Sequence, residues 1–209
     1  MKTYIIIKRL ILQINELPVT NTLITNMLET LTNTKFQIIA ATEEHLKLVS
    51  DIVALIEEAS KVPGTGIALR TEEYISKKIK RNKAIIAIHN NELAGFCYIE
   101  TWENKKYVAN SGLIVSPKLR KSGLAGKIKQ KAFELSRERY PESKIFGLTT
   151  SLPVMKINTA LGYTPVTFSE ITQDKEFWQG CESCNYYDIL VRTKRDKCLC
   201  TGMLFDPKQ

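Results

Sequence analysis

The stretch from Ser111 to Arg137 constrains the fold most, because it predicts a buried strand, a glycine-rich turn and a helix in direct succession. The apolar run Leu113-Ile114-Val115, bounded by Pro117, is typical of a buried strand. Beyond the turn, apolar side chains recur at helical spacing, at Leu124, Ile128, Ala132 and Leu135. The pattern favours a domain organised around this strand–turn–helix unit.

The turn inside this unit, residues 120–126, has the properties of an anion site. The first N–H groups of a helix have no partners within the helix, and the helix dipole is positive at that end. Gly123, Ala125 and Gly126 are small enough to let a phosphate approach the backbone. We therefore expect the turn to bind a diphosphate group, although many glycine-rich turns between a strand and a helix bind nothing.

The same turn resembles the signature Arg/Gln-x-x-Gly-x-Gly/Ala of the GNAT superfamily of acyl-CoA-dependent N-acyltransferases, here with Arg120, Gly123 and Ala125. Its surroundings are also similar to that family, because a second apolar segment at 144–150 precedes a short helix that ends at Gly162-Tyr163. An unrelated α/β turn is the alternative interpretation.

The order of the predicted elements fits the same resemblance. We expect strands at 36–41, 84–88, 94–99, 107–115, 144–150 and 199–205, and helices at 42–60, 72–81, 124–137 and 155–161. The resemblance implies an α+β GNAT fold, an α/β/α sandwich with a mixed, mostly antiparallel sheet whose two central parallel strands splay apart to admit the cofactor. Residues 1–35 would be an N-terminal extension of unknown role, and residues 36–209 the acyltransferase domain, with a Cys-rich C-terminal segment from about residue 174.

Composition limits the number of domains and the kinds of partner that the protein can have. With 209 residues, of which 44% are hydrophobic, the chain suits one globular domain with an appendage. The net charge of +8 comes without an arginine-rich block or an RNA-binding signature, which favours a solvated basic face over a nucleic-acid partner. No apolar run approaches the roughly 18 residues needed to span a membrane. The first residues weakly resemble a signal peptide, but Lys8 and Arg9 interrupt the apolar region that a signal peptide needs. We expect a cytoplasmic protein without a membrane partner.

The resemblance assigns an acyl-CoA, either acetyl-CoA or succinyl-CoA, to main-chain groups. The pyrophosphate would meet N–H groups of the turn, which consists of Arg120, Lys121, Ser122, Gly123, Leu124, Ala125 and Gly126. The pantetheine arm would pair with the strand at Leu113, Ile114 and Val115, and an N–H near Ile114 or Val115 would bind the oxyanion of the reaction.

The sequence pattern identifies the general base and the general acid of the reaction only weakly. Direct attack by an amine requires a proton acceptor, and Glu100 at a strand end is the best-placed carboxylate, although a solvated glutamate is the commoner case. His45 and His89 fall in a helical turn and a hairpin loop, where structural roles are expected. The family often has a tyrosine as general acid four residues before its Gly-Phe ending. This chain has Asn158 there, which could still hydrogen-bond the cofactor.

A closer resemblance narrows the acceptor. Residues 145–150, with the helix and strand that follow, resemble the GNAT domains of N-acetylglutamate synthases. Residues 64–68, 96–102 and 109–114 and the Cys-rich end are similar to N-acylglutamate synthase-like proteins of arginine biosynthesis. That similarity implies glutamate as acceptor, with Arg70 and Lys156 as candidate partners of its carboxylates, although Arg70 could equally be a solvent-exposed loop residue. Acetylation of a protein or antibiotic amine is the enzymatic alternative, and a zinc-containing nucleic-acid-binding module is the alternative of another class. A homodimer is compatible with the preferred interpretation.

The five cysteines are of two kinds. Cys97 lies in an apolar strand and is expected to be a small core residue. Cys181-x-x-Cys184 and Cys198-x-Cys200 have spacings found among metal ligands, and the four thiolates could enclose a structural zinc. Because the second pair is tighter than usual, buried or redox-active thiols are the alternative to a metal.

Overall fold

The computed structural model describes residues 36–209. The predictions made for residues 1–35 lie outside the described residues. Within the described part, no helix combines the length and the apolar character needed to cross a membrane.

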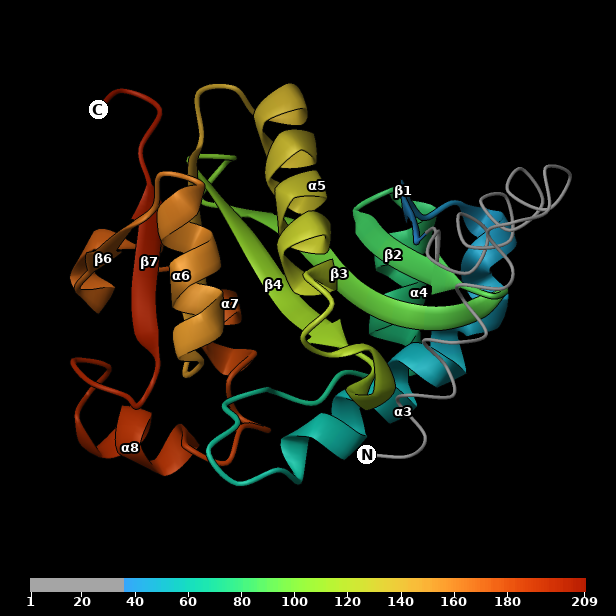
Figure 1. Ribbon diagram of the computed structural model, residues 1–209. Helices are drawn as coiled ribbons and strands as arrows, with labels where there is room; N and C mark the ends of the chain where they lie inside the picture. The colour runs from blue at the N-terminus through green and yellow to red at the C-terminus, as the bar shows by residue number, and fades with distance from the viewer. Residues whose placement is uncertain (1–35) are drawn as a thin grey trace, which may run out of the picture. The chain divides into compact units, whose positions relative to one another are not determined.

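A seven-stranded sheet forms the centre of the domain (Figure 1). Its strands are β1 (Gln37–Ala40), β2 (Ala84–His89), β3 (Glu92–Trp102), β4 (Tyr107–Val115), β5 (Lys144–Thr149), β6 (Thr164–Val166) and β7 (Thr201–Phe205). In space the order is β1-β2-β3-β4-β5-β7-β6, and each neighbouring pair is antiparallel except β4 and β5, which run parallel. The predicted mixed, mostly antiparallel sheet is confirmed.

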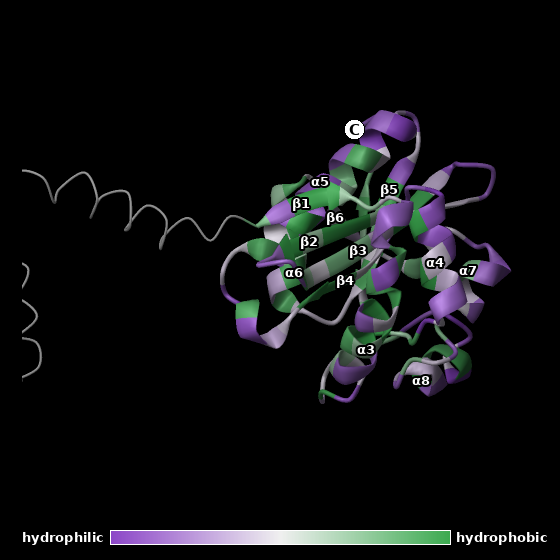
Figure 2. Ribbon diagram, turned by 90° about the vertical axis from the view of Figure 1, so that its right-hand side faces the viewer, coloured by the Kyte–Doolittle hydropathy of each residue, from purple (hydrophilic) through white to green (hydrophobic). Residues whose placement is uncertain are grey.

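Helices cover both faces of this sheet. They are η1 (Glu43–Leu48), α3 (Val49–Ser60), α4 (Glu72–Lys80), η2 (Pro117–Leu119), α5 (Leu124–Arg139), α6 (Leu152–Ala160), η3 (Phe168–Glu170), α7 (Lys175–Gln179) and α8 (Tyr187–Arg192). Figure 2 shows the largely apolar strands enclosed by helices with polar outer faces.

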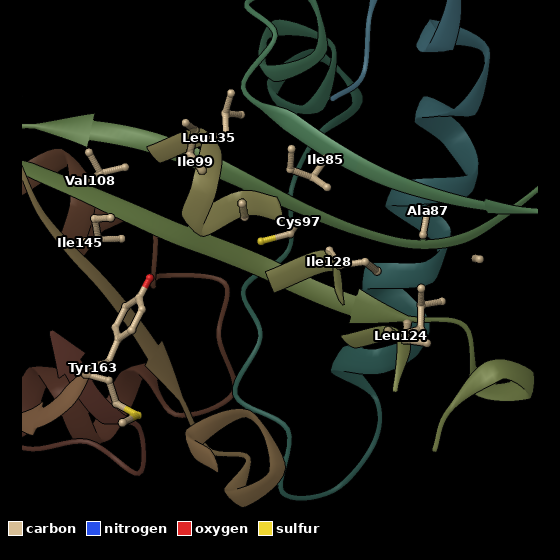
Figure 3. Packing of buried hydrophobic residues seen from close by; sticks show 14 residues of the cluster. Ile85, Ala87, Cys97, Ile99, Val108, Leu124, Ile128, Leu135, Ile145 and Tyr163 are labelled. Atoms are coloured by element: carbon tan, nitrogen blue, oxygen red, sulfur yellow. The ribbon is translucent and has the colours of Figure 1, made fainter. Parts of the chain in front are cut away.

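Alternating side chains along the strands build apolar cores on the two faces of the sheet. On one face, Ile128 of α5 packs with Cys97 and Ile99 of β3 (Figure 3). On the other face, Ile52 of α3 and Ile79 of α4 pack against β2 and β3. Each fully buried isoleucine contributes about 1.5–3 kcal/mol through removal of its apolar surface from water. These cores fix the positions of β4 and α5, which frame the site.

The parallel strands β4 and β5 separate soon after they meet. Their pairing begins at Tyr107 with Lys144 and ends at Ala109 with Phe146. Beyond that point β5 continues beside β7, and the facing edge of β4 has no partner strand among residues 36–209. We call the space between residues 110–115 of β4 and residues 147–149 of β5 the β4–β5 gap. The predicted splaying of two central parallel strands is confirmed.

A bulge in β4 lies beside this gap. Phe96 of β3 pairs with Ile114, whereas Tyr98 pairs with Ser111, so β4 contains one more residue than β3 over this interval. Gly112 occupies the bulge with φ of 66°, and a Cβ at this position would lie 2.8 Å from the Tyr98 ring. The backbone geometry and the close approach of the ring both require glycine here.

The described elements differ from the predicted ones at several boundaries. The helix predicted at 42–60 begins as η1, in which the N–H of Thr42 donates to Nδ1 of His45 at 3.1 Å, as expected for a structural histidine. Strand β3 runs on to Trp102, past the predicted end at Ile99. The elements β6, α7 and α8 were not predicted, because three to six residues are too few for a period to emerge.

Candidate active site

The N-terminus of α5 presents a row of unbonded backbone N–H groups. Gly123 adopts a left-handed conformation, with φ of 77°, at the N-cap position, and no side chain caps the helix. No acceptor in the described part of the chain takes the N–H groups of residues 121–126. The space where Gly123 and Gly126 would carry a Cβ is open. The turn therefore has the free, electropositive amides that a diphosphate requires.

A cavity of about 360 Å³ lies where β4 and β5 separate. Ser111 and Gly112 line it from β4, and Gly147 and Leu148 line it from β5. Its other walls come from β3, the loop before α4, and the segment 176–184 around α7. The cavity thus opens onto the β4–β5 gap, and β4 leads from that gap into the turn before α5.

A half-buried arginine is fixed in the wall of this cavity. Nε of Arg70 donates to the hydroxyl of Tyr98 at 3.0 Å, and Nη1 donates to the carbonyls of Leu69 at 2.7 Å and Gly180 at 3.0 Å. The guanidinium also lies over the Tyr74 ring, 5.3 Å from its centroid. Within residues 36–209 no carboxylate forms an ion pair with Arg70. The cavity therefore contains a pre-oriented positive charge available to an anionic group.

Glu100 also lines the cavity, but its carboxylate is occupied. Lys78 and Lys83 both form ion pairs with it, and the N–H of Thr101 donates to it at 2.9 Å. Although burial raises the pKa of Glu100, the hydrogen bonds from the two lysines outweigh burial and lower that pKa to about 2. A carboxylate so stabilised is a weak proton acceptor at neutral pH, which argues against the predicted role of Glu100 as the base.

These ion pairs predict an acid-sensitive contribution to stability. The pKa of Glu100 is about 2 in the folded protein against an ordinary 4.5, so its stabilisation is complete above about pH 5 and is lost as pH falls toward 2. Between about pH 6 and about pH 3, the free energy of unfolding should fall by on the order of 2 kcal/mol more in the unmodified protein than in Glu100→Gln. Urea denaturation at both pH values measures this; an equal fall in the two proteins would mean that the pKa is not depressed.

Comparison with known proteins decides the family. Residues 53–156 match the acetyltransferase (GNAT) family. The chain belongs to this family. No curated protein matches it by sequence.

Solved structures resemble this GNAT chain in fold. N-acetylglutamate synthase from Neisseria gonorrhoeae, complexed with coenzyme A and N-acetyl-glutamate, superposes with a TM-score of 0.60 at 17% identity, covering 82% of this chain and 35% of that one. Diaminobutyrate acetyltransferase from Paenibacillus lautus, in complex with L-2,4-diaminobutyric acid and coenzyme A, gives 0.56 at 8% identity, covering 83% and 96%. The chain spans about a third of the length of the synthase. At such identities the similarity establishes the shared fold.

The main-chain groups that the GNAT resemblance assigns to the cofactor are suitably placed. Leu113, Ile114 and Val115 lie on the part of β4 whose edge faces the gap, and Ile114 and Val115 pair with β3 at the other edge. Arg120, the first residue of the turn, is exposed. The predicted partners of the pantetheine arm and of the diphosphate therefore follow one another along a continuous path.

Two side chains of α6 have less favourable positions for the roles predicted. Asn158 is buried, its Nδ2 lies 3.6 Å from the sulfur of Met203, and its Oδ1 has no partner in the described structure. A contact between Asn158 and the cofactor stays a prediction. Lys156 is exposed and does not line the cavity, so its position argues against the predicted contact with the acceptor.

The C-terminal cysteines lie together in the structure. All four line a small apolar recess beside Trp178 and Leu190, and Cys181, Cys184 and Cys200 also line the main cavity. Burial raises the pKa of the Cys181 thiol to about 11, so it is protonated at neutral pH. Within residues 36–209, no group of three or more His, Cys, Asp or Glu side chains is arranged to hold a metal ion. The predicted zinc site therefore finds no support.

Cys97 lies in the core, as predicted. Its side chain is fully buried, and its Sγ lies 3.3 Å from the carbonyl oxygen of Ser111. Burial raises the pKa of its thiol to about 11.

The two tyrosines that hold Arg70, and the segment 176–184, were not predicted from the sequence as parts of the site. Tyr98 and Tyr74 lie on β3 and α4, and their ring centroids are 5.6 Å apart in the finished fold. Period-two alternation in β3 could have placed Tyr98 on the same face as Glu100. No local pattern pointed to Gly180, which joins the site through its carbonyl oxygen alone.

Proposed function

We propose that the protein is an N-acyltransferase that moves an acetyl or succinyl group from acyl-CoA to the amine of a small amino acid, with glutamate the favoured acceptor. The proposal depends on one continuous path. It leads from the free amides of the α5 turn, along the open edge of β4, to a cavity in which Arg70 has no carboxylate partner among residues 36–209. A thioester donor and a carboxylate-bearing acceptor would meet at the β4–β5 gap.

The turn and β4 suit an acyl-CoA. The free N–H groups of residues 121–126 would bind the diphosphate, and the open edge of residues 113–115 would pair with the amides of the pantetheine arm. Acyl-CoA supplies an activated thioester. An N–H of β4 near Ile114 would donate to the oxyanion that develops as the acceptor amine attacks. The chain thereby contributes orientation and charge stabilisation rather than a covalent intermediate.

The charges around the cavity favour an acidic acceptor. Arg70 contributes a positive charge without a carboxylate partner in the described structure. The group formed by Lys78, Lys83 and Glu100 adds a net charge of +1, because two ammonium groups share one carboxylate. Arginine suits a carboxylate because its planar guanidinium can donate two parallel hydrogen bonds. The small ligands named for the two solved structures, L-2,4-diaminobutyric acid and N-acetyl-glutamate, both carry a carboxylate, which is the group that Arg70 would bind. Glutamate as acceptor would connect the protein with arginine biosynthesis.

A screen of acyl donors against amines tests this assignment, with release of free CoA thiol as the measurement. We expect release from acetyl-CoA or succinyl-CoA to require glutamate or a close amino acid. At least one of the two mono-amides of glutamate, the α-amide or glutamine, should be a poor acceptor, because it lacks the carboxylate that Arg70 would bind, and 2-hydroxyglutarate should be inert because it lacks the amine. Release supported only by peptides or aminoglycosides would overturn the amino-acid assignment.

A further inference from the structure

Helix α5 carries a lysine that is buried without an anionic partner. Lys129 is 2% exposed, and its Nζ lies 3.4 Å from the carbonyl oxygen of Asn110 and 5.1 Å from the centroid of the Tyr163 ring. Within residues 36–209 no carboxylate forms an ion pair with it. Fully buried lysines are rare unless they are paired, because taking an ammonium group out of water is costly.

The ammonium group lies at the closed end of the β4–β5 gap. Asn110 is the first residue of β4 beyond the last pair with β5, and Gly147 is the corresponding residue of β5. A Cβ at Gly147 would lie 3.2 Å from the Asn110 carbonyl oxygen and 3.6 Å from Nζ of Lys129. Lys129 approaches the gap from the α5 face of the sheet, whereas the cavity opens onto it from the face covered by α3 and α4.

The groups that face this ammonium are neutral. Cys97 faces it from β3, and Tyr163 faces it from the turn after α6; both belong to the buried cluster drawn in Figure 3. Burial raises the pKa of both groups, which keeps them protonated. Asn110 and Ser136 are uncharged and hydrogen-bond each other at 2.8 Å. In this part of the described structure, Lys129 therefore bears an uncompensated positive charge.

A structural role explains only part of this arrangement. The carbonyl oxygen of Asn110 loses its sheet partner where the strands separate, and one N–H of Lys129 satisfies it. An ammonium group has three N–H donors, and no second acceptor for Nζ occurs in the described structure. The remaining donors are available to a group that enters the gap.

We propose that Lys129 is the general acid of the acyl transfer and protonates the departing thiolate of CoA. The inference rests on the proposed function, which brings the thioester to the point where the gap meets the cavity. As the bond from the acceptor nitrogen to the acyl carbon forms and the carbon–sulfur bond breaks, the electron pair stays on sulfur. Nζ gives its proton to that sulfur, while the acceptor nitrogen loses a proton to water. Solvent reprotonates Lys129 after CoA leaves.

Two features of the chain agree with this role. The family tyrosine that often protonates the thiolate is replaced here by Asn158, which has no acidic proton at neutral pH. Burial lowers the pKa of Lys129 to about 8, close to the ordinary value of about 8.5 for a thiol, so proton transfer between the two is nearly balanced.

The pKa of the CoA thiol in the complex tests the proposal directly. We expect the ammonium to lower that pKa by at least about one unit from its free value near 8.5, measured by the ultraviolet absorbance of the thiolate against pH. A complex with CoA that lacks the sulfur atom gives the baseline for the protein's own cysteines and tyrosines. An unshifted thiol pKa in the unmodified protein would overturn the acid role, whereas failure to bind CoA at all would overturn the proposed function as well.

Lys129→Met removes the charge at nearly constant side-chain volume. The variant should bind CoA within about threefold of the unmodified protein but return the thiol pKa to its free value. It should lower kcat about 100-fold or more and abolish the loss of activity that occurs as pH rises through about 8. The exposed Lys131→Met on the same helix is the matched control and should change neither quantity. A folded Lys129→Met with an unchanged pH profile and thiol pKa would refute the assignment.

Discussion

Replacing Gly123 with aspartate is expected to abolish binding of acyl-CoA, with at least about a 100-fold loss of affinity, or roughly 2.7 kcal/mol. Gly123 is the N-cap of α5 and contributes no side chain beside the free N–H groups. The carboxylate of an aspartate there would accept a hydrogen bond from one of these N–H groups, as N-cap aspartates do, and would place a negative charge against the diphosphate. Titration calorimetry with acyl-CoA measures the loss directly.

Two further variants separate charge from backbone strain. Gly64→Asp is the matched control, because Gly64 also has positive φ, 82°, and open space around its Cβ position, but it lies in the loop after α3. It should incur a similar strain of about 1–2 kcal/mol and leave acyl-CoA binding intact. Gly123→Asn offers an uncharged cap and should weaken binding less than aspartate. Normal acyl-CoA affinity in a folded Gly123→Asp protein would show that the diphosphate binds elsewhere.

Arg70→Ala is expected to raise the KM for the amino-acid acceptor about 30- to 100-fold while changing the KM for acyl-CoA less than about threefold. The expected loss corresponds to a charge-assisted hydrogen-bonded pair worth about 2–3 kcal/mol. Nη2 of Arg70 takes part in no hydrogen bond in residues 36–209, so it is free for a carboxylate. Initial rates with each substrate varied separately measure the two constants.

The control for this variant is Arg192→Ala, which removes an exposed arginine of α8 that contacts Asp188. It should alter neither constant. Because Arg70 also braces Tyr98 and Gly180, the melting temperature of Arg70→Ala must be compared with that of the unmodified protein. Equal rises in both KM values would remove Arg70 from the acceptor site and assign it a structural role.

The part of the site that sequence predicted well is local along the chain. The turn at residues 120–126 depends on neighbouring residues: a buried strand before it, small residues within it and helical spacing after it. Those features determine the backbone and its free N–H groups almost without tertiary information. The splayed strands were predicted through family resemblance, and the pairing that ends at Ala109 and Phe146 agrees with that expectation.

The part that sequence could not predict depends on residues brought together by packing. Glu100 was predicted as the base from its expected position at a strand end, but its pKa is governed by Lys78 on α4 and Lys83 before β2, and no spacing rule links the three residues. Lys156 was selected for its charge, whereas the rotation of α6 leaves it exposed. Lysine in a helix is usually exposed to solvent, so the sequence did not predict that Lys129 is buried. It is buried because its face of α5 packs over the β4–β5 gap.

The bulge of β4 makes the alignment of donor and acceptor depend on a single backbone position. Any side chain at Gly112 would press on the Tyr98 ring, and that ring holds Arg70 through a 3.0 Å hydrogen bond. The same substitution would shift the strand edge that faces the gap. Under the proposed function, replacing this glycine would therefore weaken the binding of the acyl donor and of the acceptor in one step.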